Sequence, residues 1–167
     1  MAKDNLIIRE LKRKETAFLK EALYEAIFIP AGKERLPKEI IERPELNRYI
    51  SNFGRKDDFC LVAEYNGVLV GAIWTRIFTE SEKGYGYVDE FTPELSMSVL
   101  GKYRNKGIGT QMLNLMIALI ENKAYEQISL SVDKANYAYG LYEKHGFMVH
   151  SETNDSVTMI RKTIKNA

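Results

Sequence analysis

A strand, a glycine-containing turn and an amphipathic helix follow one another between residues 95 and 122. Leu95 to Leu100 has the pattern of a strand. A helix of about four turns is predicted over 107–122 by apolar residues at helical spacing, namely Ile108, Met112, Leu115, Met116 and Leu119. Residues 128–132 then alternate with period two, as a strand does. Because a helix connects them, we expect the strands 95–100 and 128–132 to be parallel.

The dipeptide Asn66-Gly67 predicts a hairpin. It lies between the apolar runs 59–65 and 68–78, and both residues of such a tight turn need a positive φ. Similar patterns predict further strands at 6–9, 147–151 and 157–163, and further helices at 15–28, 45–52 and 136–145. We therefore expect an α/β protein of the mixed α+β kind, a single domain over residues 1–167, with helices on the faces of a mixed sheet.

Composition removes several classes of function. Lys and Arg number 24 and Asp and Glu 23, so the net charge of +1 gives no argument for a nucleic-acid partner. One Cys and two His predict no metal site and no disulfide framework. The first five residues lack the apolar core of a signal peptide, and the most apolar stretch, 112–120, is too short to cross a bilayer. We therefore expect a cytoplasmic protein that has no membrane partner.

The turn before the helix 107–122 predicts an anion site. Gly107 and Gly109 let the backbone curl closely around a ligand, and the first N–H groups of the helix have no partner within it. These donors and the helix dipole favour a phosphate or pyrophosphate, and Lys102, Arg104 and Lys106 add positive charge. The alternative is a solvated basic loop. A Walker A loop is excluded because Ile108 follows Gly107, and the dinucleotide fingerprint lacks its third small residue.

Two motifs resemble those of the GNAT superfamily of N-acetyltransferases. Arg104-x-x-Gly107-x-Gly109 after Val99 resembles the acetyl-CoA-binding motif. Residues 136–147, Asn-Tyr-Ala-Tyr-Gly-Leu-Tyr-Glu-Lys-His-Gly-Phe, are similar to the second signature, NxxAxxLYxxxGF, with the alanine one place early at Ala138. The resemblance covers nearly the whole chain. It implies the GNAT fold, with a mostly antiparallel central sheet of about six to seven strands and helices on both faces.

The resemblance also implies acetyl-CoA as the cofactor and assigns residues to it. The pantetheine arm would lie beside a strand that splays from its parallel neighbour, with backbone contacts at Met97, Ser98 and Val99. Asn136 would hold the same arm through its amide, although a plain helix N-cap is the alternative role. The site is completed by Tyr139, Tyr142 and the N–H groups that would bind the pyrophosphate, those of Arg104, Asn105, Lys106, Gly107, Ile108, Gly109 and Thr110.

For catalysis, the resemblance assigns Tyr142 as the acid that protonates the departing CoA thiolate. The alternative for Tyr142 is a core aromatic residue. The resemblance places the oxyanion donor on a backbone N–H of the splayed strand, that of Met97 or Ser98. Glu94 is the leading general base; Asp89, Glu90 and water are alternatives, and the three carboxylates could equally be surface charge.

The predicted reaction transfers an acetyl group from acetyl-CoA to a primary amine by direct attack in a ternary complex. Cys60 lies in an apolar run, where a buried, inert thiol is expected, so no residue suits a covalent acyl-enzyme. The acceptor is expected to be a small molecule or a peptide. The segments 29–57 and 79–93 are expected to cover the side of the sheet where it binds. The alternative function is a catalytically inactive acyl-CoA-binding sensor or interaction module. A homodimer is left open.

Overall fold

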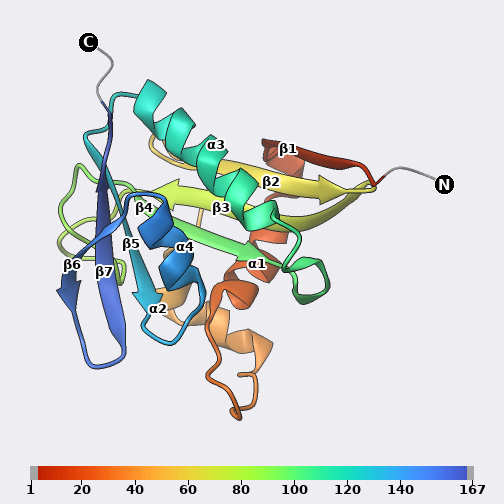
Figure 1. The fold of residues 1–167 in the computed structure, drawn as a ribbon, viewed down its shortest axis with the longest axis horizontal. Coiled ribbons are helices and arrows are strands. Elements are labelled where there is room, and N and C mark those ends of the chain that lie inside the picture. Colours follow the sequence, from red (N-terminus) through yellow and green to blue (C-terminus); the bar gives the residue numbers. More distant parts are fainter. Residues whose placement is uncertain (1–3, 165–167) are drawn as a thin grey trace.

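The computed structural model describes residues 4–164, which form one seven-stranded sheet. The strands are β1 (Leu6–Glu10), β2 (Phe59–Tyr65), β3 (Val68–Arg76), β4 (Glu94–Val99), β5 (Gln127–Asp133), β6 (Met148–Glu152) and β7 (Ser156–Lys162). Their spatial order is β1-β2-β3-β4-β5-β7-β6, as can be followed in Figure 1. Neighbouring strands are antiparallel except β4 and β5, which are parallel. The predicted parallel crossover is therefore confirmed.

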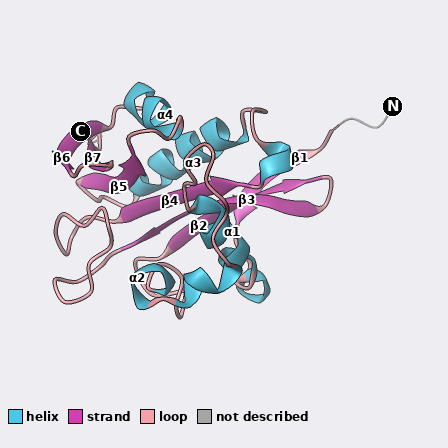
Figure 2. Ribbon diagram, turned by 90° about the horizontal axis from the view of Figure 1, so that it is seen from below, coloured by secondary structure: helices cyan, strands magenta, loops and turns pink. Residues whose placement is uncertain are grey.

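Helices cover both faces of the sheet, as predicted. The α-helices are α1 (Phe18–Ala26), α2 (Pro44–Asn47), α3 (Ile108–Asn122) and α4 (Ala138–Lys144), and short 3-10 helices span Arg13–Glu15, Lys38–Glu42 and Gly101–Tyr103. Figure 2 shows α3 and α4 on one side of the sheet and α1 and α2 on the other. Each side has its own apolar cluster: Met112, Met116 and Ile120 of α3 belong to one, and Leu19 and Leu23 of α1 to the other.

The hairpin prediction is confirmed in its backbone angles. Asn66 has φ 48° and Gly67 has φ 84°, and Tyr65 pairs directly with Val68. The helices before this hairpin are shorter than predicted. The apolar pattern over 15–28 folds as a 3-10 turn followed by α1, and the helix expected over 45–52 is the single turn α2. Outside its short helices, the segment between α1 and β2 is held in place by contacts with the rest of the fold.

The strongest of these contacts is a buried ion pair beneath the segment 48–58. Arg76, at the end of β3, is 1% exposed and donates to both carboxylate oxygens of Asp58, at 2.7 and 3.0 Å. The same guanidinium donates to the backbone carbonyls of Arg48 and Ser51, at 2.8 and 2.7 Å. Arg76 therefore fixes the backbone on both sides of Tyr49, the residue that faces the site described below.

Asp58→Ala is expected to lower the free energy of unfolding by about 3–5 kcal/mol, because it leaves the Arg76 guanidinium buried without its counter-ion. Urea denaturation followed by circular dichroism measures this loss. Lys134→Ala is the matched control, since it removes an exposed ion pair with Glu152 that should contribute under about 1 kcal/mol. Equal losses in the two variants would contradict a structural role for the Arg76–Asp58 pair.

Candidate active site

A cavity of about 1140 Å³ opens where β4 and β5 separate. The two strands pair at only one register position, Glu94 with Ser129, and the Ser129 N–H donates to the Pro93 carbonyl at 3.0 Å. Beyond this point their arrows diverge in Figure 1. The cavity wall is built from β4, the turn before α3, the end of β5, α4 and the segment that follows α1.

The separation leaves backbone groups of β4 facing the cavity. Leu100 donates its N–H to the carbonyl of Val70, its register partner on β3, at 2.8 Å. Hydrogen bonds alternate along an antiparallel pair, so Ser98 bonds to β3 whereas the N–H and C=O of Met97 point toward β5. The Ser98 hydroxyl is also engaged, donating to the Ala22 carbonyl at 2.7 Å. Of the two backbone donors considered for the oxyanion, only the Met97 N–H faces the cavity.

The turn that follows β4 presents a row of free N–H donors. Asn105 and Gly107 have positive φ values of 62° and 79°, which curl the backbone into a concave loop. Within the described part of the chain, the N–H groups of residues 105–110 donate to no acceptor, and the first bond into α3 comes from Gln111 to Gly107. Together with the N-terminal dipole of the 15-residue helix α3, this loop has the geometry of an anion site.

Arg104 closes the loop back onto the protein. Its Nε donates to the Val99 carbonyl at 3.0 Å, and its guanidinium lies 3.3 Å from the carboxylate of Glu25 on α1. Glu25 also pairs with Arg35 at 2.7 Å, so one carboxylate holds an arginine from each side of the cavity.

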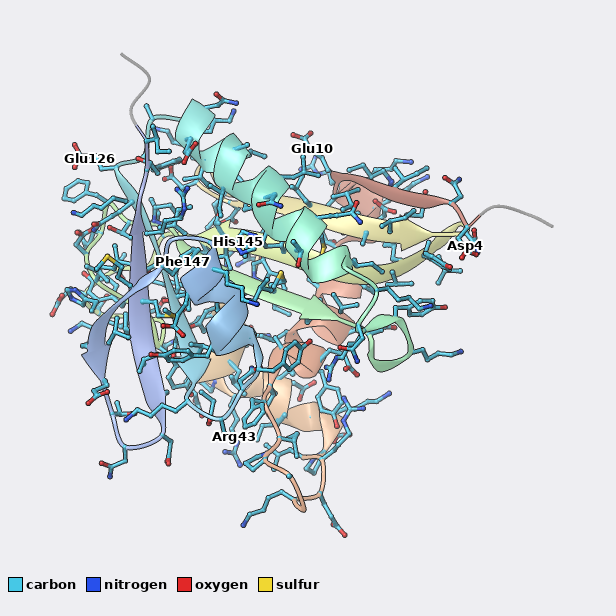
Figure 3. The ribbon with its side chains drawn as sticks, viewed as in Figure 1. Asp4, Glu10, Arg43, Glu126, His145 and Phe147 are labelled. Carbon is cyan, nitrogen blue, oxygen red and sulfur yellow. The ribbon has the colours of Figure 1, made fainter. Side chains whose placement is uncertain are left out.

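Tyr142 lies in the wall formed by α4. The side chain is buried, and its ring meets that of Phe147, labelled in Figure 3, edge-on with centroids 5.7 Å apart. No hydrogen bond joins its hydroxyl to the described residues, and Tyr142 belongs to the lining of the cavity. Burial raises the pKa of Tyr142 above its ordinary value, so the phenol keeps its proton at neutral pH. A protonated phenol in a cavity wall can act as an acid.

Glu94 lies on β4, on the sheet face that carries α1 and α2. It is 3% exposed, and the Tyr49 hydroxyl donates to its Oε2. Burial raises the pKa of Glu94 to about 7, and the hydrogen bond from Tyr49 opposes part of that rise. A carboxyl group with this pKa can accept a proton near neutral pH.

The loop 79–93 covers Glu94. A Cβ on Gly84 would lie 2.3 Å from Glu94 Oε1, and a Cβ on Gly86 would lie 2.6 Å from the Leu130 carbonyl carbon, so only glycine permits this close packing. Tyr85, between these glycines, donates its N–H to the Tyr49 hydroxyl at 2.7 Å and forms part of the cavity wall.

The alternative bases are engaged elsewhere. Asp89 accepts hydrogen bonds from the Phe91 N–H and the Thr92 hydroxyl, both at 2.8 Å. Glu90 accepts from the Glu80 N–H at 3.1 Å. Both carboxylates stabilise the loop 79–93, and neither lines the cavity.

Most of the residues predicted for the cofactor lie together around the cavity, and two do not. The lining contains Glu94, Met97, Ser98, Val99, Arg104, Asn105, Gly107, Ile108, Gly109, Thr110, Asn136 and Tyr142. Lys106 is exposed and lies outside the cavity lining, although its N–H is one of the free donors of the loop 105–110. Tyr139 packs against the apolar cluster beneath α4. Asn136 caps α4, since its Oδ1 accepts from the Ala138 N–H at 2.9 Å, and its side-chain amide group makes no hydrogen bond to the described residues.

Sequence reasoning missed Tyr49. It lies 45 residues before Glu94, in a segment with weak periodicity, and no motif marks it. The buried Cys60 lies outside the cavity lining, and burial raises the pKa of its thiol. Residues 4–164 contain no group of three or more His, Cys, Asp or Glu side chains arranged to hold a metal ion. In the same residues, no helix is long and apolar enough to span a membrane.

The sequence model of the acetyltransferase (GNAT) family matches residues 20–147. The chain belongs to this family. Among curated relatives, the N-alpha-acetyltransferase 50 of Danio rerio is 26% identical over 144 residues, which cover 85% of this GNAT protein and 69% of the relative. The resemblance inferred from the two motifs is therefore confirmed.

Solved structures agree with the fold. The PaiA N-acetyltransferase of Thermoplasma acidophilum, in complex with coenzyme A, has a TM-score of 0.67 and 22% identity, covering 95% of this chain and 99% of that one. A GNAT phosphinothricin acetyltransferase of Sinorhizobium meliloti, in complex with AcCoA, also has a TM-score of 0.67, with 16% identity over 95% of this chain and 88% of that one. The GNAT fold, predicted from the sequence, is confirmed.

Glu94→Gln is expected to stabilise this GNAT protein more at pH 8 than at pH 5. The folded pKa of about 7 lies above the ordinary 4.5, so the stability linked to Glu94 is full below pH 4.5 and is lost as the pH rises through 7. The amide side chain of the Glu94→Gln variant does not ionise, so the variant does not lose this stability. The difference in unfolding free energy between variant and wild type should grow by about 2–3 kcal/mol between pH 5 and pH 8, measured by urea denaturation. A difference independent of pH would contradict the raised pKa.

Proposed function

We propose that this GNAT protein transfers an acetyl group from acetyl-CoA to a primary amine by direct attack in a ternary complex. One observation carries the proposal: free backbone donors for an anion, an unpaired β4 edge, the Tyr142 phenol and the buried Glu94 carboxyl group all border the same cavity. This combination favours an enzyme over the acyl-CoA sensor, because a binding module needs neither Tyr142 nor Glu94 there.

The residues present fit acetyl-CoA. The N–H groups of residues 105–110 would bind the pyrophosphate. The Met97 carbonyl and the Val99 N–H would pair with the amides of the pantetheine arm, which leaves the Met97 N–H for the thioester oxygen. The side-chain amide of Asn136 would add a further donor beside that arm. Two solved GNAT neighbours, in complex with coenzyme A and AcCoA, support this choice of ligand.

The side chains and backbone then divide the chemistry. Bound acetyl-CoA supplies an electrophilic thioester carbonyl and a thiol leaving group. The Met97 N–H donates to the carbonyl oxygen as negative charge develops on it. Glu94 receives one proton from the acceptor ammonium, and Tyr142 gives its proton to the departing sulfur and recovers one from the attacking nitrogen. No covalent acyl-enzyme is needed, and the buried Cys60 thiol is not placed to form one.

The acceptor is proposed only as a primary amine of a small molecule or peptide. Its end of the cavity is lined by apolar side chains that follow α1 and by the segment around α2, including Arg43, labelled in Figure 3. The names of the relatives include an N-alpha-acetyltransferase and a phosphinothricin acetyltransferase, two different acceptor classes.

Calorimetry with acetyl-CoA, NAD and ATP is expected to detect binding of acetyl-CoA alone, because the 105–110 loop lacks both nucleotide fingerprints. Thiol release with a panel of primary amines should then identify turnover. Absence of acetyl-CoA binding would overturn the proposal. Binding without turnover on any amine would favour the sensor.

Tyr142→Phe is expected to lower kcat by about tenfold to a thousandfold with little change in the Kd of CoA, since it removes one proton donor and keeps the buried ring. Steady-state kinetics and calorimetry separate these two effects. Tyr125→Phe is the control, because the Tyr125 hydroxyl bonds Asp57 outside the cavity lining. An unchanged kcat in Tyr142→Phe would remove the assigned role.

A further inference from the structure

The Tyr49 hydroxyl is bonded to Glu94, and both residues border the cavity. It donates to Glu94 Oε2 and accepts the Tyr85 N–H at 2.7 Å, while Tyr49 itself forms part of the cavity wall. Tyr49 is 6% exposed, and its ring packs edge-on against Phe78, with centroids 4.9 Å apart. Its backbone carbonyl accepts from the Trp74 indole at 3.1 Å. The hydrogen bond to its backbone carbonyl and the ring contact with Phe78 therefore hold the Tyr49 phenol in one orientation.

The Glu94 carboxylate is 3% exposed, and Tyr49 is its side-chain hydrogen-bond partner in the described structure. Its Oε1 lies under the backbone of Gly84, where even a methyl group would not fit, and it makes no hydrogen bond in the described structure. Its Oε2 is bonded by Tyr49. The Tyr49 hydroxyl therefore offers a hydrogen-bonded path for a proton from the cavity to Glu94 Oε2.

We infer that Tyr49 is a catalytic residue that relays a proton from the acceptor ammonium to Glu94. This inference rests on the proposed function. An N–H proton of the ammonium passes to Tyr49 Oη while the proton already on Oη passes to Glu94 Oε2. The products are a neutral amine, an unchanged phenol and a protonated carboxyl group, so charge and protons balance. The phenol oxygen accepts the Tyr85 N–H on one side and has a second acceptor position for the amine.

Among the described residues, the charged neighbours of Glu94 on β3 and in the covering loop are already paired with other side chains. Arg76, its register partner on β3, is neutralised by Asp58 at 2.7 Å. Ser129, its partner on β5, offers a buried hydroxyl that carries no charge. In the covering loop, Lys83 and Glu80 pair with each other at 3.0 Å. Tyr49 is the titratable group bonded to the carboxylate, whose pKa, raised by burial to about 7, suits a proton acceptor at neutral pH.

The test compares Tyr49→Phe with wild type on two acceptors. For an alkylamine that is an ammonium ion at pH 7.5, kcat/KM should fall at least tenfold, because the relay oxygen is gone. For trifluoroethylamine, which is already neutral at that pH, the loss should be threefold or less. Tyr125→Phe, which removes another phenol bonded to a carboxylate, should match wild type on both acceptors.

A second readout needs neither cofactor nor turnover. Carbon-13 NMR of the Glu94 carboxyl in the free protein should give a higher pKa in Tyr49→Phe than in wild type, because the variant loses a donor that stabilises the carboxylate. The double variant Tyr49→Phe/Glu94→Gln should be no slower than the slower single variant, since the two residues act in one chain of transfer.

The outcomes separate the relay from the function on which it rests. Wild-type protein that binds no acetyl-CoA and acetylates no amine would overturn the proposed function, and the relay with it. Active wild type with an equally active Tyr49→Phe would overturn the relay alone. Equal losses on both acceptors would do the same, because they would mark Tyr49 as a structural residue.

Discussion

The divergence of β4 from β5 is the constraint on which the rest of the site depends. Each strand is fully paired on its other side, β4 with β3 over six register positions and β5 with β7 over seven. The sheet can therefore open between them without leaving either strand without a partner. The opening exposes the Met97 edge and directs the turn 101–107 and the helix α4 toward one cavity.

The chemistry placed around this opening needs few of the usual catalytic side chains. The chain has one Cys and two His, and its net charge is +1. In the proposed reaction, backbone N–H groups would supply the anion and oxyanion donors, and phenols and one carboxyl group would transfer the protons. Burial brings the pKa of Glu94 to about 7 and raises the pKa of Tyr142 further above neutral pH. The Arg76–Asp58 pair contributes indirectly by fixing the backbone beside Tyr49.

Local signals in the sequence predicted the structural elements that depend on residues adjacent in the chain. Asn66-Gly67 predicted the hairpin, and Gly107 predicted the tight turn before α3, since a positive φ there depends on the residue itself. Contacts between distant segments were beyond reach, above all Tyr49 with Glu94. Motif position placed Tyr139 at the cofactor, but it does not record the direction of a side chain, and the fold packs Tyr139 against the apolar cluster beneath α4. Lys106 was predicted through its backbone N–H, which belongs to the loop 105–110, whereas the residue itself is exposed.

The most direct test of this account is an amide NMR titration of the uniformly nitrogen-15-labelled protein with acetyl-CoA. If the open β4 edge and the following loop form the cofactor site, the largest chemical-shift changes will be those of Met97, Val99 and residues 105–110. Amides of β1 and the C-terminal half of α3, which border a shallow groove elsewhere, should change little. Changes concentrated in that groove, or none at Met97 and Gly107, would contradict the account.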